Sequence, residues 1–399
     1  MSKEVISRRI NQLSESQTIQ MNQKSRELKE AGVDVINLTL GEPDFNTPEH
    51  VKEAAIEAVR NNLSHYPPVA GFPDLKNAIA KKLLVDNGLE YRADQIVVSG
   101  GAKHSLANVL QCVVDAGDEV IIPAPFWVSY LDLVKLAEGT PVVVEAGVET
   151  KFKITPQQLE ESITPKTKAI LFNSPSNPTG SVYSYEELEA LAKVLEKYPQ
   201  VYIISDEIYE KINFVGKHVG LGEFDALKER TIVINGVSKG YAMTGWRIGY
   251  IAAPALIVKA VTKLQGQFTS GVCSIAQAAS IKAFEGDQRC VEDMRIAFEK
   301  RRNLVLDIVK DIPGFKVAIP DGAFYIFPDI SEYFGKRNGD VTITNSMDMS
   351  LYLLESVYVA SVPGSAFGSN NCVRFSYATA DDLLIEAFNR VKKALAQLK

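Results

Sequence analysis

Short apolar runs alternate along the chain with longer segments in which apolar residues recur every three or four positions. Such runs predict buried strands, and they lie at 96–98, 119–122, 141–144, 169–172, 201–204 and 231–234. The helical spacing predicts amphipathic helices, at 19–29, 48–61, 75–84, 151–163, 186–197, 256–265, 273–285 and roughly 288–311. Strands that alternate with helices indicate an α/β fold.

The two ends of the chain add short strands to this pattern. One is expected at 35–40, and others follow Pro313 at 315–318, 323–327, 357–360 and 372–376. A closing helix is expected from Ala380 onward. We find no internal repeat and no low-complexity linker.

Composition narrows the class of protein. A chain of 399 residues with 46% hydrophobic and 23% charged residues can bury a large core and form two or three lobes. A net charge of −6 gives no electrostatic argument for nucleic acid or an anionic membrane as a partner. The four scattered cysteines lack metal-binding spacing and indicate reduced thiols in the cytoplasm. We expect no secretory signal, no membrane span and no metal site.

Several residues that could take part in catalysis or cofactor binding lie close together in the segment 235–249, NGVSKGYAMTGWRIG. Lys239 follows a predicted buried strand, and lysines are rarely buried unless the amine is kept partly deprotonated to attack a carbonyl. Arg247 can grip a phosphate with its planar guanidinium. An amine and a phosphate clamp together suggest pyridoxal phosphate. A surface loop after a strand explains the same residues without a cofactor.

This segment resembles the cofactor-lysine signature S-K-x-x-x-M-T-G-W-R-x-G of the class I/II pyridoxal-phosphate aminotransferases. Further motifs of that family recur in order: GEPDF at 41–45, NSPSNPTG at 173–180 and VRFSYA at 373–378. The resemblance implies a fold-type I transferase with a mostly parallel central sheet. It also implies a large domain at 48–287 and a small domain built from the N-terminal segment 1–47 and from 288–399.

The resemblance assigns the cofactor site. Lys239 is expected to form the Schiff base and Asp206 to pair with the pyridine nitrogen. Tyr209 and Asn177 are expected to bond the phenolic oxygen, and Trp127 to stack on the ring. Further cofactor contacts are expected from Gly101, Ala102, Lys103, Ser238 and Arg247, with Ser99 nearby, and from Tyr66 of the neighbouring subunit in a homodimer.

Ordinary structural roles compete with several of these assignments. Large aromatic residues such as Trp127 usually pack a core, Asp206 is well placed to cap a helix, and Tyr66 suits packing in a proline-rich loop. Gly236 also departs from the family pattern, in which the position three before the lysine is often serine. One phosphate contact is therefore missing, and backbone groups or Ser238 are the expected substitutes.

The predicted reaction is transamination between an amino acid and a 2-oxo acid. Arg374 is expected to hold the substrate α-carboxylate, with Gly41, Trp127 and Asn177 around it. Two alternatives remain: another pyridoxal-phosphate reaction such as a β-lyase or a decarboxylation, and a ligand-sensing regulator. The second usually carries an added DNA-binding domain, for which the family match, beginning near the N-terminus, leaves no room.

The expected substrates are aspartate and 2-oxoglutarate. The segment 264–270, LQGQFTS, lacks the arginine that one aspartate aminotransferase branch uses for the distal carboxylate. A second branch uses a lysine and N-terminal hydroxyls, for which Lys103, Ser16 and Thr18 are candidates. A solvated lysine and a helix cap explain these residues equally simply. Prephenate, which also has two carboxylates, and a broad or aromatic specificity are the alternatives.

Overall fold

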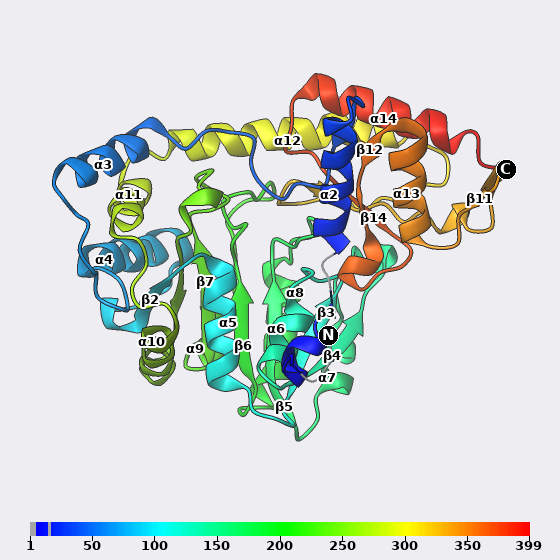
Figure 1. Ribbon diagram of the computed structural model, residues 1–399. Helices are drawn as coiled ribbons and strands as arrows, with labels where there is room; N and C mark the ends of the chain where they lie inside the picture. Colours follow the sequence, from blue (N-terminus) through cyan, green and yellow to red (C-terminus); the bar gives the residue numbers. More distant parts are fainter. Residues whose placement is uncertain (1–4, 15–16) are drawn as a thin grey trace.

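A seven-stranded sheet forms the centre of the computed structural model, which describes residues 5–14 and 17–399 (Figure 1). The strand order is β2-β8-β7-β6-β5-β3-β4, and only β8 runs antiparallel to its neighbours. The strands are β2 (Ile96–Ser99), β3 (Glu119–Ala124), β4 (Thr140–Glu145), β5 (Thr167–Asn173), β6 (Tyr202–Asp206), β7 (Thr231–Gly236) and β8 (Gly249–Ala252). The predicted α/β fold with a mostly parallel central sheet is confirmed.

Both faces of this sheet are covered by helices, which is why its strands are continuous apolar runs. Successive residues of β6 point to opposite faces: Ile204 packs with Leu106 and Val109 of α5 (Ala102–Val113), whereas Ile203 packs with Leu188 of α8 (Tyr185–Glu196). The remaining helices around the sheet are α3 (Glu49–Arg60), α4 (Pro73–Lys82), α6 (Tyr130–Leu136), α7 (Pro156–Ser162), α9 (Asp225–Lys228), α10 (Ala255–Phe268) and α11 (Ser274–Glu285).

The two ends of the chain build a second layer together. The strand β1 (Ile36–Asn37) pairs in parallel with β12 (Val359–Ala360), so residues separated by most of the sequence lie side by side. A three-stranded sheet, β13-β14-β9, lies nearby and consists of β13 (Val362–Pro363), β14 (Val373–Ser376) and β9 (Tyr325–Ile326). Its core is shared with α12 (Arg289–Val309), α13 (Ser346–Val357) and α14 (Asp381–Leu395).

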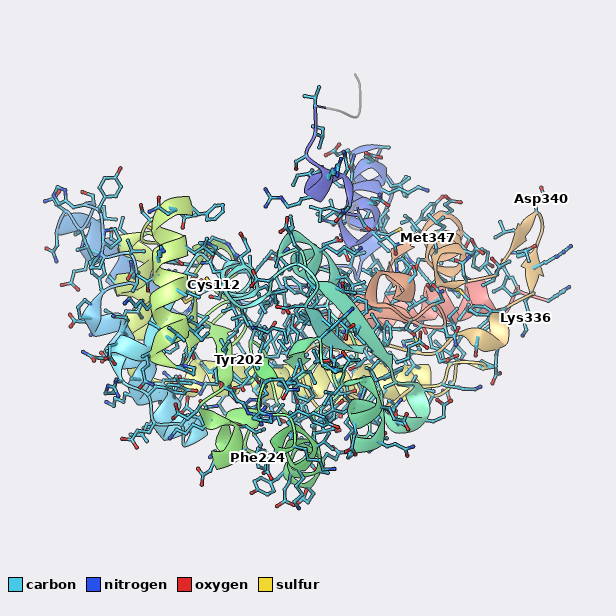
Figure 2. All side chains as sticks on the ribbon, turned by 90° about the horizontal axis from the view of Figure 1, so that it is seen from below. Cys112, Tyr202, Phe224, Lys336, Asp340 and Met347 are labelled. Atoms are coloured by element: carbon cyan, nitrogen blue, oxygen red, sulfur yellow. The ribbon has the colours of Figure 1, made fainter. Side chains whose placement is uncertain are left out.

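The long helix α12 links the two parts of the molecule. In Figure 1 it runs in yellow from the region of α3 and α11 to α14, and the blue helix α2 (Gln17–Glu30) stands beside this C-terminal layer. The hairpin of β10 (Arg337–Asn338) and β11 (Val341–Thr342) projects at the far edge, where Lys336 and Asp340 are labelled in Figure 2. None of the helices within residues 5–14 and 17–399 has both the length and the apolar run needed to cross a bilayer.

Two predicted elements are wrong or incomplete, and other elements were missed. The helix expected at 151–163 begins only at Pro156, because Lys151 and Phe152 have positive φ angles and Thr155 caps the helix by accepting from the Gln158 N–H. The segment 315–318 forms a single β-bridge at Lys316 rather than a strand. The helix α13 and the strand β8 were not predicted as elements.

Gly236 occupies a position where the backbone itself leaves no space. It pairs with Gly249 across β7 and β8, and a Cβ atom at Gly236 would lie 2.7 Å from the Ile248 carbonyl oxygen and 2.9 Å from the Gly249 Cα. A side chain there would push the two strands apart. The absence of serine at this position therefore has a steric reason.

We expect Gly236→Ala to lower the free energy of unfolding by about 1–3 kcal/mol, because overpacking against backbone cannot relax easily. Urea denaturation of the variant measures this loss. Gly245→Ala is the matched control, since a Cβ at Gly245 would meet nothing within 4 Å. Equal stability of both variants would contradict the steric explanation.

Candidate active site

A cavity of about 350 Å³ opens at the carboxyl ends of the parallel strands, where α/β folds place their ligands. Asn173 ends β5, Asp206 ends β6, and Ser238 and Lys239 follow β7. The predicted site residues that line it come from the whole chain: Thr18, Gly41, Ala102, Lys103, Trp127, Asn177, Asp206, Tyr209, Ser238, Lys239, Arg247 and Arg374.

Lys239 lies in the wall of this cavity, and its amine donates a short hydrogen bond to the Gly41 carbonyl oxygen. The amine also lies 5.8 Å from the centre of the Tyr209 ring. Burial is the main cause that lowers the pKa of Lys239; together with the positive charges of Arg247 and Arg374, and against a raising effect of Glu42, it brings the pKa to about 8. A larger fraction of this amine is therefore neutral and nucleophilic near neutral pH than of an ordinary lysine.

Asp206 is a buried carboxyl group at the floor of the cavity. Burial raises its pKa to about 6, although the Tyr130 hydroxyl donates to its Oδ2 atom at 2.7 Å and the Ile208 N–H donates to Oδ1 at 3.3 Å. The side chain thus makes a local cap-like contact and also faces the cavity. A positively charged or N–H-bearing ligand would stabilise its ionised form.

Three polar side chains from different segments of the chain form a chain of contacts beside Asp206. The hydroxyls of Tyr209 and Tyr325 lie 2.8 Å apart, and the Asn177 amide nitrogen lies 3.5 Å from the Tyr209 oxygen. The Asn177 backbone N–H donates to the Asn173 side chain at 3.0 Å, which fixes the direction of the Asn177 side chain. Burial strongly raises the pKa of Tyr209, so its hydroxyl stays protonated and can donate.

Arg374 is buried with only 3% of its surface exposed, yet it has no ion-pair partner within residues 5–14 and 17–399. Its guanidinium donates to Asn177 Oδ1 at 2.9 Å and to the Thr39 carbonyl oxygen at 2.6 Å. The Nε–H finds no acceptor in the described part of the chain. Since a buried charge is costly unless it is paired, a bound anion would stabilise this arginine.

A second corner of the site lies at the N-terminus of α5, where helix N–H groups lack partners within the helix and can bind an anion. Arg247 reaches this point and donates to the Gly100 carbonyl oxygen at 3.1 Å. Gly101 precedes the helix with φ of +91°, and a Cβ there would lie 2.3 Å from the Arg247 Nη2 atom. Glycine is thus required for the arginine to approach the helix start.

The residues predicted for a distal carboxylate lie at one side of the cavity. The Lys103 amine stands 4.8 Å from the centre of the Trp127 ring, and burial followed by the Arg247 charge lowers the pKa of Lys103. Thr18 lies in the cavity wall, and its buried hydroxyl has no hydrogen-bond partner in the described part of the chain. Ser16 falls outside the described residues.

Three of the predicted residues, Gly101, Tyr66 and Ser99, do not line the cavity of their own chain. Tyr66 is 98% exposed and lies away from it. The Ser99 hydroxyl is buried and donates to Gln265 at 2.7 Å, so Ser99 serves the core. Conversely, sequence reasoning missed Tyr130, Asn173 and the role of Tyr325. The signal for Tyr130 is its position three residues after Trp127, which places both on the same side of a helical turn.

The family described as aminotransferase class I and II matches residues 33–391. This chain belongs to that family. An aspartate aminotransferase of Geobacillus stearothermophilus is 49% identical over 97% of this chain and 98% of its own length. A probable aspartate/prephenate aminotransferase of Rickettsia felis is 47% identical over 99% and 97%.

Solved aminotransferases have the same fold as this chain. The aspartate aminotransferase of Rhizobium meliloti superimposes with a TM-score of 0.96 at 41% identity, covering 99% of both chains. That of Thermus thermophilus, solved with maleate, has a TM-score of 0.92 at 40% identity and covers 98% of this chain and 99% of its own. The chain is therefore a fold-type I aminotransferase, and pyridoxal 5'-phosphate is its cofactor.

The cavity fits this cofactor chemically. An aldehyde needs a partly neutral amine, a pyridine nitrogen needs a buried carboxylate, and a phosphate needs backbone N–H groups with an arginine. Around the same cavity, Lys239 provides the amine and Asp206 the carboxylate. Arg247 and the start of α5 provide the groups for a phosphate. The unpaired Arg374 remains free for a second anion.

We expect the reaction of the cofactor-free protein with pyridoxal phosphate to speed up as pH rises. Because the pKa of Lys239 is lowered to about 8, the neutral amine and the rate should increase about tenfold per pH unit below pH 8 and level off above it. Stopped-flow absorbance measures the rate. Lys239→Ala is the control and should not react, and a midpoint near 10.5, the ordinary lysine value, would contradict an enclosed amine.

Proposed function

We propose that the cavity residues hold pyridoxal phosphate in the arrangement expected from the family. Arg247 and the backbone at Gly101 and Ala102, where the Ala102 N–H is the donor, bind the phosphate with Ser238 and with Tyr66 of a partner. Asp206 keeps the pyridine nitrogen protonated, and its own bond from Tyr130 supports the ionised form. Tyr209 and Asn177 bond the phenolic oxygen, and Trp127 lies against the ring. The carrying observation is the lowered pKa of Lys239 beside the unpaired Arg374.

When bound, pyridoxal phosphate supplies an electron sink that weakens the bond between the α-carbon and its hydrogen. Arg374 binds the α-carboxylate through its planar guanidinium and so orients that bond. Lys239 Nζ takes the proton and returns it, because a neutral amine with a pKa of about 8 can both accept and donate near neutral pH. Gly41 positions this amine through its carbonyl oxygen.

We further propose that the substrates are aspartate and 2-oxoglutarate. Both relatives cited above carry aspartate in their names. Lys103 and Thr18, together with Ser16, would bind the distal carboxylate, and support comes from the unpartnered Thr18 hydroxyl in the cavity wall. Prephenate is the second candidate, because the Rickettsia felis relative is named for it and it also has two carboxylates.

Lys103→Ala is expected to lower kcat/KM for aspartate by roughly 10–100-fold, since a hydrogen bond to a charged group contributes about 1.5–3 kcal/mol. The same variant should change kcat/KM for phenylalanine or alanine by less than about threefold. Lys135→Ala is the control, because Lys135 lies near the cavity but pairs with Asp132 at 3.8 Å. Equal losses for acidic and neutral donors would assign Lys103 to the cofactor or to the fold.

We propose a cytoplasmic homodimer with shared active sites. The four cysteines are unpaired, as expected in a reducing compartment. A second cavity of about 860 Å³ adjoins the first, and Arg247 lines both. The exposed Tyr66 of a partner would reach the phosphate from this side. We also propose the domain limits 48–287 for the large domain and 1–47 with 288–399 for the small one, which the pairing of β1 with β12 supports.

Mixing Lys239→Ala with Tyr66→Phe chains tests the shared site. A mixed dimer contains one site with both native residues, so subunit exchange should restore about a quarter of the wild-type activity per site. Neither variant alone should reach that level. Enzyme assays before and after exchange at low urea measure the gain. Full activity of a species that light scattering identifies as a monomer would refute the dimer.

A further inference from the structure

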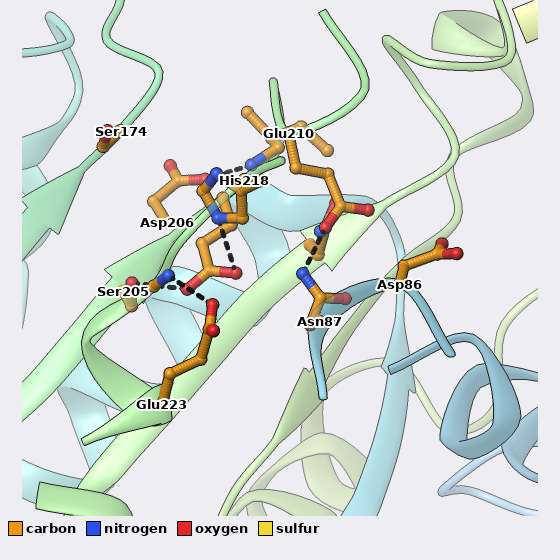
Figure 3. Close-up of polar contacts among 12 residues, drawn as sticks. Asp86, Asn87, Ser174, Ser205, Asp206, Glu210, His218 and Glu223 are labelled. Carbon is orange, nitrogen blue, oxygen red and sulfur yellow. Dashed lines mark hydrogen bonds and ion pairs between the residues drawn. The ribbon is translucent and has the colours of Figure 1, made fainter. Parts of the chain in front are cut away.

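A second buried group of charged side chains lies behind Asp206, outside the residues that line the cavity (Figure 3). Glu207, Glu210, His218, Lys82 and Asn87 belong to it, and none exposes more than 8% of its surface. Charged residues are almost never buried this deeply unless they are paired. None of them has a part in the proposed binding of cofactor or substrate.

Glu210 is held from two directions. The Lys82 ammonium contacts its Oε1 atom, and the Asn87 amide donates to its Oε2 atom at 3.0 Å. Lys82 also donates to Asn87 at 2.7 Å, so the three side chains form a closed triangle. A π-helical turn over Leu83–Asn87 brings Lys82 and Asn87 to the same carboxylate, and such turns are frequent at functional sites.

Glu207 is held in the same way. It accepts from the Ser205 hydroxyl at 2.8 Å and forms an ion pair with His218 at 3.1 Å. Burial lowers the pKa of His218, but the two glutamates outweigh it and the net pKa is raised. Burial likewise raises the pKa of Glu210, but Lys82 and His218 outweigh it and bring the value to about 2.

The ligating atoms of Glu207, Glu210 and His218 lie within 4.8 Å of one another, a spacing that would suit a metal ion. Two positive side chains, however, already contact the two carboxylates. The Lys82 ammonium touches Glu210 directly, at the place that an ion would need. The positive charges of Lys82 and protonated His218 therefore balance the two glutamates, and the group does not need a metal ion for neutrality.

The network is joined to the active site through one turn of backbone. The Glu210 N–H donates to the Glu207 carbonyl oxygen at 2.9 Å, so residues three apart share a face of this turn. Asp206 and Tyr209 face the cavity, whereas Glu207 and Glu210 face the network. Residues that face the cavity and residues that face the network alternate along this turn. If Glu207 and Glu210 shift, the backbone must therefore also move Asp206 and Tyr209.

We propose that Glu210, held by Lys82 and Asn87, is a positioning residue that fixes Asp206 and Tyr209 at the cofactor. This inference rests on the roles proposed above for those two residues. A buried ion pair adds little net stability compared with apolar side chains of similar size, so stability alone does not account for this one. An effect of the ion pair on the position of the neighbouring residues accounts for it better, because a misplacement of about 1 Å in a catalytic group can lower the rate about 100-fold.

The experiment separates position from stability with two variants. Glu210→Gln takes away the buried carboxylate that pairs with the Lys82 ammonium and leaves it only Asp86, at 3.9 Å, so it should lower Tm. The double variant Lys82→Met with Glu210→Gln removes both charges and should recover most of that Tm. In both variants we expect kcat to fall at least about tenfold, KM for the amino donor to change less than about threefold, and the dissociation constant of pyridoxal phosphate to rise about tenfold.

Equilibrium dialysis measures cofactor affinity independently of activity. A double variant that is stable and has wild-type kcat and cofactor affinity would overturn the inference, and so would a loss of activity on chelation of metals. Glu187→Gln is the matched control, because it breaks the Lys153–Glu187 ion pair of 2.6 Å far from the turn and should leave cofactor affinity unchanged. Asp206→Ala is measured in parallel. If it retains wild-type cofactor affinity, the proposed role of Asp206 fails; if only the double variant does, the role of Glu210 fails.

Discussion

The burial of the Arg374 guanidinium without a negative partner in the described chain is the constraint on which the site depends. An arginine cannot lose its proton to escape this cost, so neutral oxygen atoms and aromatic faces must hold it. Asn177 and Thr39 accept its hydrogen bonds, and the rings of Tyr325 and Phe367 lie 4.5 and 4.9 Å from it. The hydrogen bond from Arg374 also holds Asn177 next to Tyr209. The need to stabilise the buried arginine therefore fixes the polar side chains in this wall of the cavity.

The other charges of the cavity respond to the same enclosure. Lys239 is shifted toward its neutral form by burial and by two nearby arginines, whereas Asp206 is shifted toward its protonated form by burial. Positive charge therefore predominates until anions enter. A bound phosphate and a substrate carboxylate would balance this positive charge, and a protonated nitrogen beside Asp206 would favour its ionised form. Ligand binding and the protonation of Lys239 and Asp206 would therefore be coupled through the charges of the site.

Local pattern revealed the strands that carry the site but not the contacts between them. The buried strands β3, β5, β6 and β7 are continuous apolar runs, and each was predicted within a few residues. The strand β8 was missed because it is short and begins with a glycine that belongs to the preceding motif. The late start of α7 was missed because the positive φ angles before it leave no periodic signal in the sequence. The bond from Tyr130 to Asp206 joins residues 76 positions apart, and that from Arg374 to Asn177 spans 197. Only family resemblance, not spacing, could bring such pairs together.

The parallel pairing of β1 with β12 has a consequence for how the protein is made. Ile36 is translated 323 residues before its partner Val359. At about 5–20 residues per second, the N-terminal strand waits for tens of seconds before its edge can be covered. The intervening sheet, whose strands lie between residues 96 and 252, can collapse during that interval. Gly41 follows the waiting strand, so the amine of Lys239 gains its carbonyl partner only after Val359 has been translated and paired.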